Sequence, residues 1–386
     1  MDINAIQKDF PALAHGPFFD NGTVSLTPAP VSAALERILH DTLDSGPPHV
    51  LLPENEYPLR LATMTKIADF LGTSRNRVAL TRGVSEAFET VLRGLEWHAG
   101  DEIVITEDEH AALLLPVLHL RDSVGVKVSK LRFAAASDDP YRALASLITT
   151  QTRLVALSHV TTRFGYRFPV RELCDAARTY GVPSFVDVAH SAGVVPFTLD
   201  DLGCDFAGAL SYKWMYGPYA AGVLYIRAAS LGLLALRYAG SRSEDWLDVD
   251  TDTYKLYDDT RRFEYGPFAW SIVHGWAAAL DYLGRLDRRQ VIARTEALVA
   301  KLREGLQGIQ GVNVLTPPAE SAGALVTFTV NDLASSAVQT RLLDEHRIRI
   351  KAVPESSFVR ASLAVFVSDE ALQNLVEAVA RIAASG

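Results

Sequence analysis

The chain has 386 residues, enough for two domains, and 48% of them are hydrophobic, so a sizeable core can be buried. Its formal net charge of −9 argues against nucleic acid or an acidic membrane surface as a standing partner. The two cysteines, Cys174 and Cys204, form neither a metal motif nor a disulfide framework, which favours a reducing cytoplasm. We expect no signal peptide and no transmembrane helix, because no apolar stretch of about 18 residues occurs.

Apolar, strand-like runs alternate with longer helical patterns through the first two-thirds of the chain. This alternation predicts an α/β fold, with a mostly parallel sheet sandwiched by helices. Three strands are each followed by a helix, at 78–81 and 85–95, 102–106 and 111–122, and 154–158 and 170–180, and three further strands lie at 184–188, 206–210 and 223–227.

A polar, tyrosine-rich stretch at 241–265 ends this pattern. The elements predicted after it are helices at 270–286 and 288–307, a strand at 323–330, a helix at 336–346, strands at 347–353 and 358–363, and a final helix from Ser368. This order is typical of a smaller α+β domain. We therefore expect a large domain over 16–265 and a small one over 266–386, with 1–15 packed on the small one.

The most informative residue is Lys213, which follows the apolar run 206–210. Burying an ammonium group costs roughly several kcal/mol, so a lysine there needs a use. A partly buried, deprotonated lysine can form a Schiff base with a carbonyl compound. Of the eight lysines, only Lys213 and Lys351 lie beside apolar strand-like runs, whereas Lys127 and Lys130 are in polar or helical-looking surroundings.

Asp187 ends an apolar run 26 residues before Lys213. Taken alone, an aspartate there is equally typical of a cap on the next helix. Together, the lysine and the aspartate match the needs of pyridoxal phosphate (PLP), which takes a covalent anchor and a carboxylate beside its ring nitrogen. Because ligands bind at the carboxyl ends of parallel strands, one edge of the sheet should gather the polar residues that follow the apolar runs, Thr81, His110, His159, Asp187 and Lys213.

A phosphate seat is predicted at 83–85, where Gly83 and Ser85 lie in a strand-to-helix turn. Helix N-terminal N–H groups and the helix dipole favour an anion there, although plain N-capping by Ser85 explains the same pattern and is favoured in isolation. His110, at the start of a helix, could stack on the cofactor ring or move a proton. By itself, a histidine facing solvent is the simpler interpretation.

Two further residues fit a binding site. His190, three residues after Asp187, could contact a cofactor oxygen, or could be an ordinary histidine in a turn. Arg360 lies within an apolar strand, where its planar fork suits a substrate carboxylate. An edge-strand arginine in water is the alternative.

These segments resemble the class V aminotransferase family of fold-type I PLP enzymes, which includes cysteine desulfurases and isopenicillin-N-epimerase-like proteins. The resemblance runs from Phe18 to Ser362, nearly the whole chain. The motifs that carry it are Val186-Asp187-Val188-Ala189-His190-Ser191-Ala192-Gly193, Ser211-Tyr212-Lys213-Trp214-Met215-Tyr216-Gly217-Pro218, Thr81-Arg82-Gly83-Val84-Ser85-Glu86-Ala87, Glu109-His110-Ala111 and Arg262-Phe263-Glu264-Tyr265-Gly266.

The resemblance implies a role for each matching residue. Lys213 would hold PLP covalently, Asp187 would pair with its ring nitrogen, and His110 would stack on the ring. Arg360 would bind the substrate carboxylate, with Asn21 beside the substrate. The remaining cofactor-binding residues would be Gly83, Val84, Ser85 and Ser211 at the phosphate, His190 at the phenolate oxygen, and Tyr212 and Thr162 nearby. Family members are homodimers with active sites at the interface, and the same is expected here.

The chain also departs from the family pattern. Desulfurases of the family carry a nucleophilic cysteine ahead of the carboxylate-binding arginine, and residues 331–360 here contain none. Tyr212 stands where the family often has histidine, Thr162 where it often has asparagine, and Pro267 where it often has a threonine that reaches the partner's phosphate. The missing cysteine argues against persulfide chemistry of the desulfurase type, and the changes together favour a specialised substrate.

Reaction type in such enzymes is decided by geometry and proton placement. Loss of the Cα proton leads to β-elimination when Cβ carries a leaving group, and otherwise to transamination. We expect a C–S lyase acting on a cysteine-derived or other β-substituted amino acid. The alternatives are an aminotransferase or a decarboxylating deaminase, then an epimerase, and outside enzymes a PLP-binding protein without turnover. No metal is expected.

Overall fold

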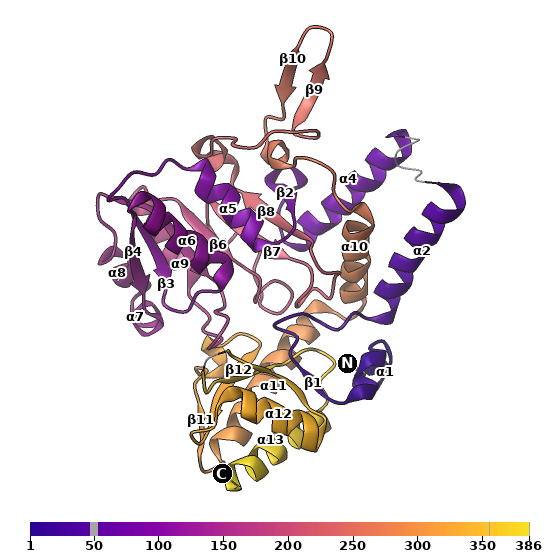
Figure 1. The fold of residues 1–386 in the computed structure, drawn as a ribbon, viewed down its shortest axis with the longest axis vertical. Helices are drawn as coiled ribbons and strands as arrows, with labels where there is room; N and C mark the ends of the chain where they lie inside the picture. The colour runs from indigo at the N-terminus through magenta and orange to yellow at the C-terminus, as the bar shows by residue number, and fades with distance from the viewer. Residues whose placement is uncertain (47–52, 355, 386) are drawn as a thin grey trace.

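The computed structural model describes residues 1–46, 53–354 and 356–385. They form a larger part around a seven-stranded sheet, a smaller part around a five-stranded sheet, and a two-stranded arm that projects from the larger part (Figure 1). The first helix, α1 (Ile3–Lys8), lies beside the smaller part, which also carries the C-terminus.

The seven-stranded sheet has the order β2-β8-β7-β6-β5-β3-β4. Only β8 runs antiparallel to its neighbours, and the pairs from β7 through β4 are parallel. All residues of β2, β6, β7 and β8 are buried, as expected for a sheet covered on both faces. The strands are β2 (Val78–Thr81), β3 (Glu102–Thr106), β4 (Lys127–Leu131), β5 (Thr152–Ser158), β6 (Ser184–Asp187), β7 (Phe206–Leu210) and β8 (Gly222–Ile226).

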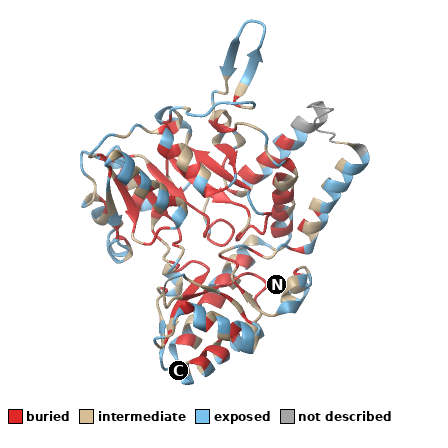
Figure 2. Ribbon diagram, viewed as in Figure 1, coloured by how far each residue is buried: buried red, intermediate tan, exposed pale blue. Residues whose placement is uncertain are grey.

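Alternate residues of these strands enter two separate cores. Ile103 and Ile105 pack with α5 (Val84–Gly94) and α6 (Ala111–Val124), whereas Val104 between them packs with α9 (Val170–Thr179) on the other face. The strands appear red between paler helices in Figure 2, because the buried residues concentrate in the sheet. The α/β sandwich predicted from the sequence is confirmed. The short helices α7 (Phe133–Asp138) and α8 (Pro140–Ala145) lie between β4 and β5.

The smaller sheet has the order β1-β13-β14-β12-β11 and is covered by α11, α12 and α13. Its first strand comes from the N-terminus, where β1 pairs in parallel with β13. Its elements are β1 (Phe18–Phe19), α11 (Arg288–Gln307), β11 (Val312–Val314), β12 (Leu325–Val330), α12 (Ser335–His346), β13 (Arg349–Ala352), β14 (Val359–Ser362) and α13 (Asp369–Ala384). The helix α10 (Trp270–Arg285) packs instead against α2 (Ala29–Ser45) and α4 (Pro53–Phe70). The domain boundaries drawn from the sequence stay a prediction.

Five strands have no counterpart in the sequence analysis: the short strands β1 and β11, and β4, β9 and β10. The edge strand β4 contains Lys127 and Lys130, and it lacks the apolar run that marks the buried strands. The polar stretch 241–265 contains β9 (Glu244–Asp248) and β10 (Thr253–Leu256), which pair only with each other. The residues of these two strands are mostly exposed, so no alternation of apolar and polar residues was needed to form them.

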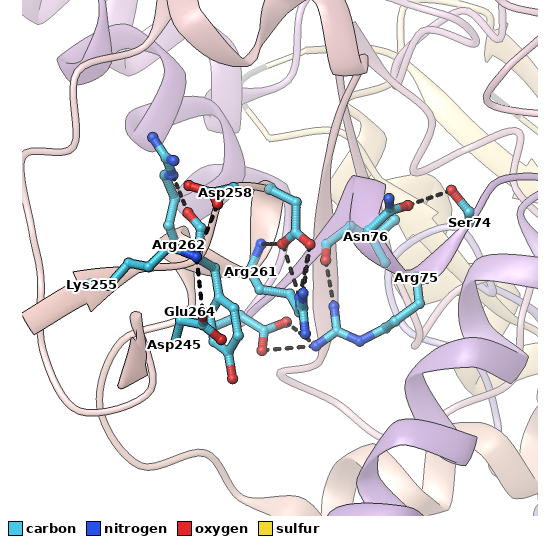
Figure 3. A network of polar contacts seen from close by, with 12 residues as sticks. Ser74, Arg75, Asn76, Asp245, Lys255, Asp258, Arg261, Arg262 and Glu264 are labelled. Atoms are coloured by element: carbon cyan, nitrogen blue, oxygen red, sulfur yellow. Dashed lines mark hydrogen bonds and ion pairs between the residues drawn. The ribbon is translucent and has the colours of Figure 1, made fainter. Parts of the chain in front are cut away.

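The segment between the arm and α10 is tied to the start of β2 (Figure 3). Both oxygens of Glu264 accept hydrogen bonds at 3.0 Å from Nη2 of Arg75, and one accepts the backbone N–H of Leu80 at 2.9 Å. Lys255 at the base of the arm pairs with Asp245 and Asp258 at 3.0 and 3.2 Å. Glu264 therefore fixes β2, which leads directly into the turn at Gly83.

Candidate active site

The carboxyl ends of the central parallel strands bring the predicted residues together. Asp187, the last residue of β6, is in register with Ser158 at the end of β5 and with Gly208 of β7. Lys213 follows the end of β7 by three residues. The topology therefore places the aspartate and the lysine at one edge of the sheet.

Lys213 is buried, and its Nζ lies 3.0 Å from Nε2 of His190. Burial lowers its pKa to about 8; Asp187 acts in the opposite direction, and Arg360 lowers it further. The amide of Asn21 donates to the backbone carbonyl of Lys213 at 3.1 Å and holds the loop that carries it. A substantial fraction of the amine is therefore neutral just above neutral pH, the form that attacks carbonyl groups.

Asp187 is buried at the end of its strand, and its Oδ1 accepts the backbone N–H of Ala189 at 2.7 Å. Burial raises the pKa of its carboxyl, while this hydrogen bond and the nearby charge of Lys213 lower it. The side chain thus caps a turn and not a helix, which was the alternative, because the residues after Asp187 form turns. The same carboxylate can face a cationic ring nitrogen.

The two histidines of the site are neutral. His190 is buried, and burial, with the charges of Lys213 and Arg360, holds its pKa well below the usual value. His110 as a residue reaches the surface, but desolvation of its imidazole, and then the charges of Lys213 and Arg360, lower its pKa to about 4. His110 caps α6, where its Nδ1 accepts the N–H of Ala112 at 3.0 Å. Its ring orientation is therefore fixed by the helix start.

The turn before α5 has the geometry of an anion seat. Gly83, not Ser85, is the N-cap of α5; it has φ of +153° and no side-chain cap. The first N–H groups of the helix therefore have no capping side chain. A groove of about 450 Å³ opens here, lined by residues that include Arg82, Gly83, Ser85 and Tyr265.

Two more predicted residues lie in the loop after β7. The buried hydroxyl of Ser211 donates to the carbonyl of Pro218. The ring of Tyr212 packs on Tyr219, with 4.4 Å between centroids, and burial raises its pKa to about 12. Tyr212 therefore stays a protonated phenol, able to donate a hydrogen bond.

Arg360 is a buried residue of β14, between β12 and β13, so the alternative of a solvated edge-strand arginine is wrong. Its Nη1 donates to the carbonyl and the hydroxyl of Thr162 at 2.8 and 3.2 Å. Its Nη2 donates to the hydroxyl of Thr23 at 3.0 Å and lies 3.5 Å from Asp20. Arg360, in the five-stranded sheet, and Thr162, in a turn after β5 of the seven-stranded sheet, are thus joined directly.

The sequence reasoning missed three residues of the site. Glu109 is buried and receives hydrogen bonds from Thr106 and from the backbone and hydroxyl of Ser158, the latter two at 3.0 and 2.6 Å. Burial raises the pKa of Glu109 to about 8. Asp20 and Thr23, which contact the guanidinium of Arg360, are the other two. The available signal was that these residues lie next to or near the predicted residues His110 and Asn21 in the sequence. That closeness does not reveal their long-range contacts.

Neither cysteine belongs to the site. Cys174 and Cys204 are buried, and burial raises the pKa of Cys174 to about 12 and that of Cys204 well above its usual value. Both are therefore inert thiols at neutral pH. No group of three or more His, Cys, Asp or Glu residues suited to a metal occurs in the part of the chain that the structure describes.

The sequence and the fold of the chain match those of known proteins over almost its full length. The model of the class V aminotransferase family matches residues 18–375. A protein of Mycobacterium leprae described as probable cysteine desulfurase 2 is 30% identical, over 99% of this chain and 96% of its own. A complex of the cystine C–S lyase C-DES with its product cysteine persulfide superposes with a TM-score of 0.89 at 27% identity, covering 96% of this chain and 99% of the other. A lysine-to-alanine mutant of C-DES, with glycine covalently linked to the PLP cofactor, gives 0.90 at 26% identity over 97% and 98%. The chain belongs to the class V aminotransferase family.

Proposed function

We propose that this protein is a PLP-dependent C–S lyase that removes a sulfur-linked group from Cβ of a cysteine-derived or other β-substituted amino acid. The observation that carries the proposal is the constellation of buried Lys213, Asp187, neutral His190 and Arg360, without a cysteine anywhere in 331–360. The similar cystine C–S lyase supports sulfur as the leaving atom.

The residues present fit PLP. Asp187 is a buried carboxylate for the ring nitrogen, and the uncapped start of α5 offers Gly83, Val84 and Ser85 to the phosphate. Nδ1 of His190 is buried without a hydrogen-bond partner among the described residues, so a polar group of a ligand would satisfy an atom of this ring. The other residues assigned to the cofactor are Lys213 as covalent anchor, His110 on the ring, and Ser211, Tyr212 and Thr162 around it. When bound, PLP withdraws electrons from Cα of the amino acid.

The chain's own groups then divide the remaining work. Arg360 would hold the α-carboxylate, and the amine of Lys213 would take the proton from Cα. A pKa of about 8 suits Lys213 to that role near neutral pH. The pair of electrons from the Cα–H bond forms the Cα–Cβ double bond while the Cβ–S bond breaks, and the sulfur leaves as a thiolate that gains a proton. Addition of one water converts the three-carbon remainder to pyruvate and ammonia.

We infer further that the protein acts as a homodimer in the cytoplasm. Support comes from the arm β9–β10, since a two-stranded hairpin is marginally stable alone and this one exposes large apolar side chains, Trp246, Leu247, Val249 and Tyr254. A groove of about 450 Å³ beside its base is lined by residues that include Thr81, Tyr265 and Pro267, where a partner subunit could complete the phosphate seat. No helix among the described residues is long and apolar enough to cross a membrane.

The products decide between the candidate reactions. We expect incubation with L-cystine and a panel of cysteine S-conjugates to release pyruvate, ammonia and thiol or persulfide in equal amounts. Alanine as co-product would indicate desulfurase chemistry, transfer of the amino group to an added keto acid an aminotransferase, and an aldehyde with carbon dioxide a decarboxylating deaminase. Cys174→Ser with Cys204→Ala should keep the activity and carry no persulfide, and abolished turnover in a folded double variant would contradict the cysteine-free mechanism.

A further inference from the structure

The guanidinium of Arg360 has one edge, at Nε, that pairs with none of the described residues, and this unpaired edge is called the open edge below. Nη1 is engaged by Thr162 and Nη2 by Thr23, with Asp20 at 3.5 Å. Nε is buried, yet it has no hydrogen-bond partner among the residues that the structure describes. A buried guanidinium N–H without a partner costs free energy, so this edge is the place where a carboxylate would gain most.

The Nη2 end of the guanidinium is held by a compact turn after β1. The hydroxyl of Thr23 donates to Oδ1 of Asp20 at 2.7 Å and accepts from Nη2 of Arg360 at 3.0 Å. The backbone N–H of Thr23 also donates to the carbonyl of Asp20 at 3.0 Å, which closes the turn. Asp20 therefore acts on Arg360 both directly and through one bridging hydroxyl.

The turn lies against the guanidinium because residue 22 is glycine. A Cβ added at Gly22 would lie 3.3 Å from Nη2 of Arg360 and 2.8 Å from the hydroxyl of Ser362. Pairing of β1 with β13 then fixes the turn relative to the sheet that carries Arg360. Asp20 and Thr23 consequently meet a guanidinium that can rotate little.

The two charged side chains, Arg360 and Asp20, differ in their exposure to water. Arg360 is buried whereas the side chain of Asp20 keeps 24% of its exposure, so the aspartate retains contact with water and is the less costly charge to keep. Burial lowers the pKa of Arg360, and Asp20 opposes this shift; Asp20 also opposes the lowering of the pKa of Lys213. One carboxylate therefore influences both cations of the site.

We propose that Asp20, acting through Thr23, is a positioning residue that sets the open edge of Arg360 toward the α-carboxylate of the substrate. The proposal rests on the assignment of Arg360 to the carboxylate in the proposed function. It does not depend on the bond that is broken afterwards, because only binding of the carboxylate is involved.

The test compares two ligands that differ in the carboxylate alone. Glycine and methylamine are titrated into the PLP-loaded protein while the visible absorbance of the bound cofactor is followed, and the ratio of their Kd values measures the carboxylate's share. Asp20→Asn and Thr23→Val should each raise the Kd of glycine by about 10-fold, as for loss of one charge-assisted hydrogen bond. The Kd of methylamine should stay unchanged. Thr23→Ser restores the hydroxyl and should restore glycine binding.

A second readout separates charge from orientation. The pH at which the visible band of the loaded protein changes should fall in Asp20→Asn, because a negative charge that favours protonation is lost. It should stay constant in Thr23→Val, which keeps that charge. Asp41→Asn, on the exposed face of α2, is the matched control and should change neither readout.

The outcomes are distinguishable. An unchanged glycine preference in both variants, with a preference lost in Arg360→Lys, would overturn the positioning role while keeping Arg360 as the carboxylate site. Equal weakening of glycine and methylamine would mean that the turn is merely structural and would also overturn it. A glycine preference that survives in Arg360→Lys would contradict the proposed function itself.

Discussion

Nζ of Lys213 and Nε2 of His190 lie 3.0 Å apart, and both side chains are buried. Because the pKa of His190 is held well below its usual value, the imidazole is neutral and Nε2 can accept a proton in a hydrogen bond from the lysine. Lys213 is therefore the only member of this pair that titrates near neutral pH.

This pair predicts how fast the apoprotein takes up PLP. The neutral amine is the attacking form, so the rate constant should rise with pH through about 8, the pKa to which burial lowers Lys213. Stopped-flow absorbance measures the rate, and Lys213→Arg, which cannot be deprotonated in this range, is the control. A midpoint above about 10, the usual range for lysine, would show that the amine is not perturbed.

Asp187→Asn should preserve the fold and reduce turnover by at least about 100-fold, on the order of 3 kcal/mol, because the charge beside the ring nitrogen is removed. The amide can still accept the N–H of Ala189, so the turn that Asp187 caps should persist. Steady-state kinetics and Tm are measured together, with Asp139→Asn, an exposed helix cap, for comparison. Near-normal turnover would remove Asp187 from the catalytic group.

Glu109 predicts a pH dependence of stability. Its pKa in the folded protein is raised to about 8, so between its unfolded value of about 4.5 and 8 the folded state holds a proton that the unfolded state releases. Stability from this group is therefore complete below about pH 4.5 and is lost as pH rises to about 8. Glu109→Gln, a mimic of the protonated form, should lose less of its Tm between about pH 5.5 and 8.5. Parallel Tm curves for the two proteins would contradict the shifted carboxyl.

Trp246→Ser combined with Val249→Asp should weaken dimer formation without altering the fold of one subunit, because both side chains are exposed in the arm. Sedimentation equilibrium is the measurement, and Tyr141→Ser, which is similarly exposed on α8, is the matched control. Dimers of equal strength in all three proteins would exclude the arm from the interface.

Six strands of the central sheet could be predicted because each contains a run of apolar residues. The same argument fails for β4, which is half exposed and contains Lys127 and Lys130, and for the arm, whose residues are polar and exposed. A run of apolar residues in the sequence reveals a buried strand, and a strand that is not buried has no such run.

The site divides in the same way. Lys213 and Asp187 could be found because a charge at the end of an apolar strand contradicts its surroundings. The environment of Arg360 could not, since Thr23 is 337 residues and Thr162 is 198 residues away in the chain. Contacts at such separations depend on the pairing of β1 with β13 and on the packing of the two sheet-containing parts against each other. Neither can be recognised from the local sequence.

The residues proposed for the reaction and those proposed for substrate recognition belong to different sheets. Asp187 ends a strand of the seven-stranded sheet and Lys213 follows another, whereas Arg360 lies in a strand of the five-stranded sheet and Asp20 directly follows one. Substitutions in either sheet can therefore retune one half while the other keeps its geometry. A protein built in this way can acquire a new substrate without rebuilding its chemistry, and relatives that share the lysine and the aspartate can differ widely in the amino acids that they accept.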